Sequence, residues 1–363
     1  MIDRKAGIAG LKKMFDDGSL LYLNDKPKIK ILSTGIVTID YALGIGGFAR
    51  GSQYIIYGAP SSSKSMMAYT AIANVHKNDP ESLCAIIDIE RSATEEWLVK
   101  FGIDPKRVVI VQEETIEDAV NTSQKLIRAN SFDIVLIDSL GAVQRSIDFD
   151  GKDGKGGDAN TSQVGGAAKV ITNWVNKLNA EMITLDKIEA AGEEVLKPVI
   201  IFINQARDDI GNMYNSMTFG GGNAIRHIAT GILRVTASNA ANDKLMGIIN
   251  DKSVQVGTRA TVTIEKNKLA PPKRQAGYYY VYQESPEYPF GIDSVFALAE
   301  ITLELGIATS KGAWCEYPDL NGELQKVNGK QAYVQTLREN EELYRFLYQA
   351  VTDKLSENIK EES

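Results

Sequence analysis

The segment from Gly58 to Ser65 reads Gly-Ala-Pro-Ser-Ser-Ser-Lys-Ser, and it constrains the fold more than any other part of the chain. It follows the apolar run 54–57 and precedes the helix-forming stretch 66–69. A strand, a tight turn of small residues and a helix N-terminus aim backbone N–H groups and the positive end of the helix dipole at one point, where a polyphosphate can bind. The pattern predicts that Lys64 reaches the β- and γ-phosphates and that Ser65 holds Mg²⁺.

This loop departs at one position from the pattern G-x-x-x-x-G-K-[ST], because Ser63 stands where the pattern has its second glycine. A Cβ atom there must fit a tight turn that glycine adopts at little steric cost, so we expect a strained or displaced loop. A serine-rich turn before an ordinary helix is the alternative interpretation. The residues that we expect to bind the nucleotide are Gly58, Ala59, Pro60, Ser61, Ser62, Ser63, Lys64 and Ser65.

Composition argues against several other classes of protein. The formal net charge of −7 argues against coating nucleic acid by bulk positive charge, so any DNA contact must be local. Cys84 and Cys315 are far apart in sequence and predict neither a disulfide framework nor a zinc site, which fits a reducing compartment. The two histidines, His76 and His227, make a Ser-His-Asp triad a poor prospect. Without a run of about 20 apolar residues or a signal peptide, we expect a cytoplasmic protein that does not span a membrane.

Apolar strands alternate with helical patterns through the middle of the chain, which is the rhythm of βαβ units with a parallel sheet. With 363 residues, 44% of them hydrophobic, the chain can bury one large core and a smaller second one. We therefore expect an α/β fold whose mostly parallel, twisted sheet is flanked by helices. The expected strands are 53–57, 84–89, 107–111, 132–137, 198–203 and 230–236, with 260–268 and 277–283 extending the sheet. The expected helices are 64–77, 92–102, 116–130 and 166–190.

The ends of the chain follow other patterns. Residues 3–16 mix apolar and basic side chains and predict an amphipathic helix. Helical patterns at 292–305 and 340–355 enclose a short segment with Trp314 and Tyr317, which predicts a small α/β domain. Two glycine-rich polar segments, from 148 to 166 and from 207 to 222, interrupt the core, and loops of this length in a compact domain are usually functional or disordered.

Two carboxylates end apolar strands of the expected sheet. Asp138 ends the run 134–137 and is followed by Ser139, which matches a Walker B strand that binds the water shell of Mg²⁺. Glu90 ends the run 85–89, where it could align a water or accept its proton. An acidic residue that merely caps the following helix is the alternative for Glu90.

Asn204 and Gln205 end the very apolar strand 199–203 and lead into a glycine-rich loop. A side-chain amide there can hydrogen-bond the γ-phosphate and be released after hydrolysis, so the loop would report the nucleotide state. An amide that satisfies strand-end carbonyls is the alternative.

Together these segments resemble the bacterial and phage RecA-type DNA recombinases. The resemblance covers nearly the whole chain, and it separates this family from ATPases that share only the core, because the Lys-Asn-Lys-x-Ala-x-Pro segment and the Gly-Ala-Trp tail are typical of RecA. Besides the phosphate loop, the matching segments are Phe15 to Ser19, Leu32 to Gly35, Tyr41 to Gly47, Ile87 to Glu90, Ile137 to Ser139, Ile201 to Arg207, Gly221 to Ala224, Lys266 to Pro271 and Gly312 to Trp314.

The resemblance implies roles for single residues. Glu90 would be the catalytic carboxylate, Asp138 the Walker B acid and Gln205 the γ-phosphate sensor. Lys266 and Lys268, two apart on a strand and so facing the same way, would reach the ATP of the neighbouring subunit and neutralise developing charge. Without the family context, two lysines on a solvated strand edge are the alternative.

The resemblance also implies contacts with the base. Trp97 would stack on the adenine, and Tyr282 would close the base from the other side.

The same resemblance implies a division of the chain. The expected parts are 1–32 as a helix and linker that dock on the adjacent subunit, 33–287 as the ATPase core with DNA-binding loops at about 147–165 and 206–222, and 288–363 as the C-terminal domain. Head-to-tail docking would build a helical filament.

The two glycine-rich loops match the DNA-binding loops of the family. Lys169, at the start of a helix, and Arg207 would contact phosphates, and Tyr214 would enter between base triplets. Both loops also carry several aspartates, which leaves backbone N–H groups of the glycines and helix N-termini as the better phosphate donors. The remaining residues assigned to DNA are Gly220, Gly221, Gly222 and Asn223.

The function that this pattern predicts is a DNA-dependent ATPase that uses ATP and Mg²⁺, polymerises on single-stranded DNA and promotes homologous pairing and strand exchange with double-stranded DNA. Single-strand-binding and loader proteins are further expected partners. A ring helicase or motor on the same core is one alternative. A poorly hydrolysing regulatory filament protein is another, which Ser63 keeps open.

Overall fold

The computed structural model describes residues 10–11, 28–141, 163–208, 217–219 and 222–362. Most of the N-terminal helix expected over 3–16 lies outside these ranges, as does most of the first glycine-rich loop. Within them, the short strands β1 (Ile31–Leu32) and β2 (Phe48–Ala49) pair antiparallel and precede the main sheet.

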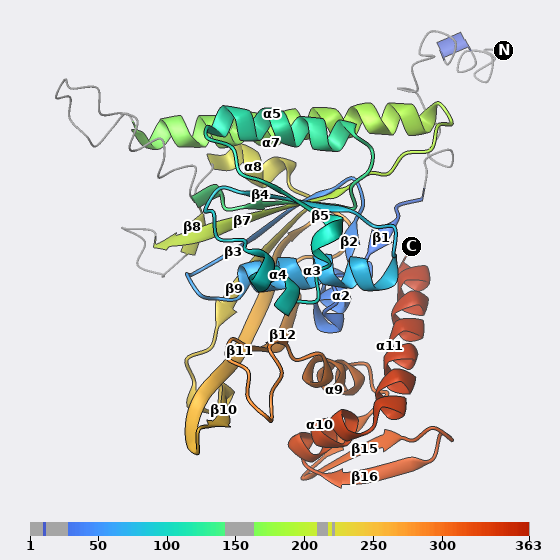
Figure 1. The fold of residues 1–363 in the computed structure, drawn as a ribbon. Coiled ribbons are helices and arrows are strands. Elements are labelled where there is room, and N and C mark those ends of the chain that lie inside the picture. The colour runs from blue at the N-terminus through green and yellow to red at the C-terminus, as the bar shows by residue number, and fades with distance from the viewer. Residues whose placement is uncertain (1–9, 12–27, 142–162, 209–216, 220–221, 363) are drawn as a thin grey trace.

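The central sheet confirms the predicted α/β fold. Its strand order is β13-β12-β11-β9-β3-β7-β6-β4-β5 (Figure 1). The strands from β9 to β5 run parallel, and they are β3 (Gln53–Gly58), β4 (Cys84–Asp88), β5 (Val108–Val111), β6 (Ile134–Asp138), β7 (Val199–Asp208) and β9 (Gly231–Ala237). Every residue of β3, β4 and β6 is buried, as in a parallel sheet covered on both faces.

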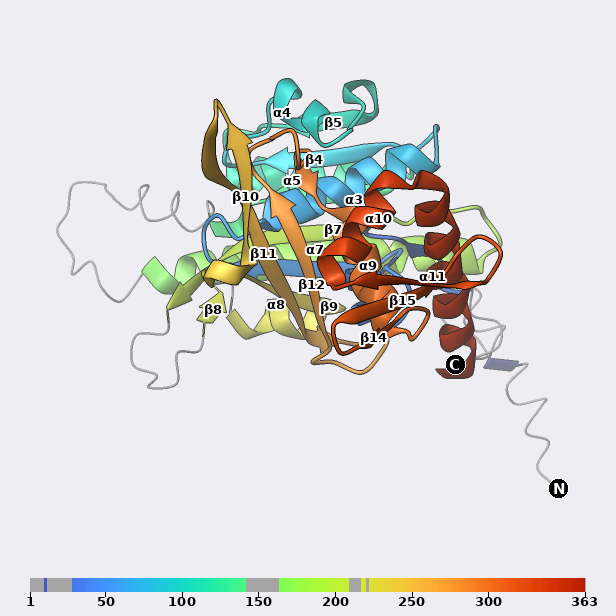
Figure 2. The same ribbon diagram turned by 90° about the horizontal axis from the view of Figure 1, so that it is seen from below.

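Antiparallel strands extend the parallel part at one side. They are β11 (Lys252–Asn267), β12 (Gln275–Val281) and β13 (Gly291–Ile292), with β10 (Lys244–Ile249) forming a hairpin with β11. The hairpin projects from the body of the molecule on the same side as α4, as the view from below shows (Figure 2). A further strand, β8 (Met217–Phe219), pairs with the end of β7.

Helices cover both faces of the sheet (Figure 1). One face carries α5 (Ile116–Arg128), α7 (Gln163–Ala190) and α8 (Gly222–Ile228), and the other carries α2 (Val37–Leu43), α3 (Lys64–Asn78) and α4 (Glu95–Lys100). Successive side chains of β3 point to opposite faces of the sheet. Ile55 and Tyr57 therefore belong to the core under α5, α7 and α8, and Tyr54 and Ile56 belong to the core under α2, α3 and α4. Short 3₁₀ turns lie at Pro105–Arg107 and Ala241–Asp243.

The C-terminal part packs around a further core, which also includes Val37 of α2. It contains α9 (Ser294–Glu304), α10 (Lys330–Glu339), α11 (Glu341–Glu362) and a three-stranded antiparallel sheet of β14 (Thr309–Lys311), β15 (Trp314–Pro318) and β16 (Leu324–Asn328). The inner side chains Cys315 and Tyr317 are buried, whereas Trp314 on the outer face of β15 is exposed.

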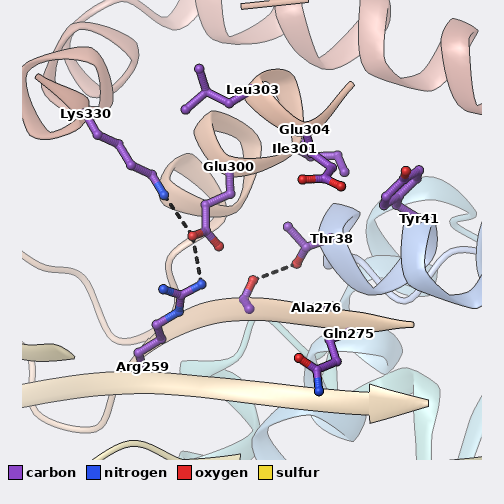
Figure 3. A pocket seen from close by; sticks show the side chains of 11 residues that line it. Thr38, Tyr41, Arg259, Gln275, Ala276, Glu300, Ile301, Leu303, Glu304 and Lys330 are labelled. Carbon is purple, nitrogen blue, oxygen red and sulfur yellow. Dashed lines mark hydrogen bonds and ion pairs between the residues drawn. The ribbon is translucent and has the colours of Figure 1, made fainter. Parts of the chain in front are cut away.

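A polar cavity of about 400 Å³ lies where this part meets the core, between α2, β11, β12 and α9 (Figure 3). Glu300 of α9 accepts hydrogen bonds from Arg259 at 2.9 Å and from Lys330 at 2.8 Å. The Arg259 guanidinium packs over Gly277, where an added Cβ would lie 2.5 Å from it. Charged contacts as well as apolar packing therefore join the two parts.

Several boundaries differ from the sequence prediction. Strand β7 continues to Asp208 and pairs with β8, so the second glycine-rich segment starts as a hairpin rather than as a loop at 206. Helix α7 begins at Gln163, so Lys169 lies in its second turn and not at its start. The patterns also missed α2, α8, α10 and β10, because each is short or mixed in polarity and owes its structure to tertiary packing.

Candidate nucleotide-binding site

The segment 58–65 forms a loop at the carboxyl end of β3, directly before α3. Gly58 lies beside Val235 of β9 in the register, and an added Cβ at Gly58 would lie 2.1 Å from the Val235 carbonyl oxygen. The close approach of two backbones therefore requires glycine at the first position of the loop.

Ser63 adopts the left-handed conformation that glycine favours, with φ +69°, and Ser61 does the same with φ +58°. The chain thus places serine side chains at two positions where L residues are strained. The strain predicted for Ser63 is confirmed, and Ser61 is a second strained residue that the sequence pattern did not indicate.

Lys64 and Ser65 occupy the first turn of α3. The Lys64 ammonium donates to the Ala59 carbonyl at 2.7 Å and so folds back over the loop. Burial lowers the pKa of Lys64, and the charges of Asp138 and Glu90 oppose that change. The Ser65 hydroxyl donates to Asp138 Oδ2 at 2.9 Å, which joins the start of α3 to the end of β6.

Asp138 is almost fully buried at the end of β6. Burial raises its pKa to about 6, with smaller contributions from the negative charges of Glu90 and Asp88, while the hydrogen bond from Ser65 and the Lys64 charge act in the opposite direction. A cation bound beside Asp138 would favour its charged form and so lower this pKa.

Glu90 and Gln205 meet beside the loop. Strand β4 ends at Asp88, so Glu90 lies two residues beyond the strand rather than at its end. Glu90 Oε1 accepts from the Ser139 hydroxyl at 2.7 Å and from the Gln205 amide at 3.3 Å. Glu90 does not cap α4, because Thr94 is the N-cap of that helix and its side chain accepts from the Trp97 N–H. The cap interpretation of Glu90 is therefore wrong.

A cavity of about 680 Å³ extends from the loop toward two aromatic residues. Trp97, 36% exposed, and Tyr282, 43% exposed, both line it, and Trp97 also packs edge-on against Phe101 and Phe290. The structure thus brings both aromatic residues to the phosphate loop. It adds lining residues that the sequence reasoning missed, namely Ser238, Asn239, Lys244, Gln255, Thr258 and Tyr280. Ser238 and Asn239 directly follow strand β9, so polar residues at a strand end, the pattern that indicated Asp138, also mark this part of the cavity.

These residues fit a nucleoside triphosphate with Mg²⁺. The Ser62 hydroxyl is buried in the loop without a hydrogen-bond partner among the described residues, as suits a group that faces a ligand. Ser65 and Asp138 supply oxygens at the point where the metal would bind, which are the donors that Mg²⁺ prefers.

Lys266 and Lys268 do not line this cavity. The Lys266 ammonium donates to the carbonyls of Arg226 and of His227, the latter at 3.0 Å, and Lys268 donates to the Ile228 carbonyl at 2.8 Å. Strand β11 ends at Asn267 after an irregularity near 264–266, yet both ammonium groups reach the C-terminus of α8. Burial and the neighbouring Lys268 lower the pKa of Lys266.

The residues assigned to DNA are only partly described. Lys169 is exposed on α7, Arg207 belongs to strand β7, and Gly222 and Asn223 begin α8. The backbone of β7 therefore connects Gln205 to Arg207 without interruption. Tyr214, Gly220 and Gly221 lie outside the described residues.

Across the described ranges we find no helix that is both long and apolar enough to cross a bilayer. Both cysteines, Cys84 and Cys315, are buried and free.

Comparison with known proteins gives one consistent result. The family model described as the RecA N-terminal domain matches residues 3–286. The chain is 31% identical over 351 residues to Protein RecA of Chloroherpeton thalassium, an alignment that spans 96% of this chain and 88% of that protein. It is 32% identical over 353 residues to Protein RecA of Chlorobaculum parvum, spanning 96% of this chain and 91% of that protein.

Proposed function

The chain belongs to the RecA family, and on this premise we propose that it is a DNA-dependent ATPase that forms helical filaments on single-stranded DNA and catalyses homologous pairing and strand exchange in recombination and repair. The observation that carries the proposal is the convergence, at one edge of the sheet, of a phosphate loop, a buried aspartate and a hydrogen-bonded Glu90–Gln205 pair.

The phosphate loop would hold the nucleotide. Backbone N–H groups at the start of α3 and the Lys64 ammonium bind the phosphates, and Lys64 exchanges its hydrogen bond to Ala59 for one to a phosphate oxygen. Ser65 and Asp138 would hold Mg²⁺, Asp138 through water. Bound Mg²⁺ draws charge from the phosphates and so favours attack at the γ-phosphorus.

Glu90 would orient the attacking water and accept its proton. Glu90 is exposed beside the loop, and the hydrogen bond from the Ser139 hydroxyl to Oε1 holds its carboxylate there. Gln205, bonded to the same carboxylate, would report the presence of the γ-phosphate along β7 to Arg207 and the predicted DNA loop beyond it.

Trp97 and Tyr282 would hold the base, and the Lys266/Lys268 pair would act on the ATP of an adjacent copy. A cation that arrives from a second protomer stabilises transition-state charge only in the assembled form, which couples hydrolysis to polymerisation. Single-stranded DNA, double-stranded DNA and further copies of the chain are the proposed partners, with single-strand-binding and loader proteins as additional ones.

The test is an ATPase assay with and without single-stranded DNA, combined with negative-stain electron microscopy in the presence of DNA and a non-hydrolysable ATP analogue. We expect DNA-stimulated hydrolysis and helical filaments. Closed rings without filaments would favour a motor. Filaments without hydrolysis would favour a regulatory scaffold, and either result would contradict the proposal.

A further inference from the structure

Three tyrosines, two on strand β12 and one directly after it, point toward the nucleotide site. Tyr278 and Tyr280 lie on β12 and Tyr282 directly follows it, so strand alternation directs all three toward the same side. Tyr282 and Tyr280 line the cavity beside the phosphate loop. Tyr279, which alternates with them, points the other way and packs against Phe296 of α9.

Two of these tyrosines are bonded to the loop itself. The Tyr278 hydroxyl lies 2.9 Å from Ser63 Oγ, and the Tyr280 hydroxyl donates to the Ser61 carbonyl at 3.0 Å. Because the Ser63 hydroxyl donates to the Ser62 carbonyl, Tyr278 is the donor in its bond to Ser63. Burial raises the pKa of both phenols, so both keep the proton that they donate.

The two contacts fall on the two strained residues. Within 58–65, Ser61 and Ser63 are the residues with positive φ, and they are the residues that the tyrosines bind. A serine in the left-handed conformation is held there only when its surroundings determine the backbone. Each phenol reaches the loop from a strand more than 200 residues away in sequence, and Tyr278 is fully buried, so these donors are rigidly placed.

We propose that Tyr278 and Tyr280 are positioning residues for ATP, which hold the phosphate loop in its binding conformation, and that Ser63 and Tyr278 form a matched pair. Glycine would adopt the left-handed conformation at this position at little steric cost. Serine does so less readily, and the hydrogen bond from Tyr278 holds Ser63 in that conformation. This inference rests on the proposed function, because it assumes that the loop binds ATP.

The pairing predicts a specific pattern of affinities. Tyr278→Phe removes the hydroxyl and little volume, and we expect it to weaken binding of ATP about tenfold, which is about 1.4 kcal/mol. Ser63→Ala keeps the Cβ and removes the hydroxyl, so it should have a similar effect. Ser63→Gly needs no anchor, so Tyr278→Phe combined with Ser63→Gly should bind ATP within about twofold of Ser63→Gly alone.

The experiment is isothermal titration of the full chain with Mg²⁺-ATP, with melting temperatures measured alongside. Tyr333→Phe is the matched control, because Tyr333 is also fully buried and its hydroxyl pairs with Thr302 at 3.0 Å in the C-terminal part. Both Tyr→Phe variants should lower the melting temperature, and only Tyr278→Phe should change the affinity for ATP. Tyr280→Phe, which removes the bond to Ser61, repeats the test if Tyr278→Phe does not fold.

Two results would overturn the inference. One is wild-type affinity in folded Tyr278→Phe and Tyr280→Phe, and the other is an equal loss of affinity in the wild-type and Ser63→Gly backgrounds, which would mark a general structural role. If the wild-type chain itself fails to bind ATP, as Lys64→Ala should, the proposed function is refuted instead. The two failures are thus distinguishable.

Discussion

The phosphate loop and the Lys266/Lys268 pair differ in the groups that they bond within one protomer. The loop is bonded to residues that surround its own cavity, as the 3.0 Å hydrogen bond from the Tyr280 hydroxyl to the Ser61 carbonyl illustrates. The two lysines are instead bonded to carbonyls at the C-terminus of α8. One half of the proposed catalytic machinery is therefore assembled in a single chain, whereas the other half holds a helix and must release it to act on a second copy.

Helix α8 connects the Lys266/Lys268 pair to the predicted DNA-binding segment. Its last carbonyls lack partners within the helix, and cations at that end are favourable for the helix dipole. The helix begins at Gly222, at the end of the predicted DNA-binding segment. Release of Lys266 and Lys268 from α8 would remove stabilisation from the element that carries this segment, so the position of the lysines and the state of the DNA loop are expected to be linked.

The largest effect is expected on the loop side of the comparison. Lys64→Ala removes the ammonium that reaches the phosphates, and we expect affinity for ATP to fall by about 1,000-fold, as for the loss of a buried charge contact at a central position. Equilibrium binding of a fluorescent ATP analogue measures it. Lys77→Ala, at an exposed position of the same helix, is the control and should bind normally. Unchanged affinity in Lys64→Ala would mean that the nucleotide lies elsewhere.

Glu90→Gln separates binding from turnover on the same side. The amide keeps the size of the side chain and cannot accept a proton from water, so hydrolysis should fall about 1,000-fold while ATP and DNA binding persist. Steady-state ATPase rates and binding of single-stranded DNA measure the two properties. Glu96→Gln, on the exposed surface of α4, is the matched control. Full ATPase activity in Glu90→Gln would show that another group orients the water.

The lysine pair should behave in the opposite manner. In the double variant Lys266→Ala with Lys268→Ala, we expect a protomer that binds ATP normally and loses about 100-fold in DNA-stimulated hydrolysis, since a cation supplied in trans stabilises charge in the transition state. Lys252→Ala, at the other end of β11, is the control.

A mixing experiment tests whether the pair acts on another copy. Filaments of Lys64→Ala protomers together with protomers of the double lysine variant contain intact loops beside intact lysine pairs, although neither protomer has both. We expect such mixtures to regain part of the DNA-stimulated ATPase activity that each variant lacks alone. If no activity returns although mixed filaments form, the lysines act within their own chain and the comparison between the two regions fails.

Sequence patterns predicted one side of this site well. Gly58, Asp138 and Gln205 lie at or near the carboxyl ends of apolar strands, and parallel strands bring those ends to one edge of the sheet. The parallel strands of the sheet and the helices α3, α5 and α7 followed from the same alternation of strands and helices. Glu90 was predicted at the end of a strand and lies two residues beyond it, because the strand ends at Asp88.

The parts that sequence did not predict depend on long-range pairing. The contacts of Tyr278 and Tyr280 with the loop follow from the antiparallel register of β11 and β12, and local pattern does not specify which distant residue a strand faces. The present partners of Lys266 and Lys268 were missed for the same reason. Their common direction was predicted, and the carbonyls that they bind belong to the end of α8, a helix that packs against α7.

The smallest expected effect is the loss of ATP affinity when Trp97, at the base end of the cavity, is replaced. Trp97 is 36% exposed and braced edge-on by Phe101 and Phe290, so its ring is positioned without the nucleotide. Stacking on a base contributes about 1–3 kcal/mol, and the exposure of Trp97 places the loss near the lower limit, so Trp97→Ala should weaken ATP binding about tenfold or less. Trp97→Phe should retain most of the affinity. Inorganic triphosphate has no base, and its affinity depends on the loop alone. It should therefore bind equally to the wild-type chain, Trp97→Ala and Trp97→Phe. A loss of triphosphate binding in Trp97→Ala would show that the base end of the cavity and the loop are coupled.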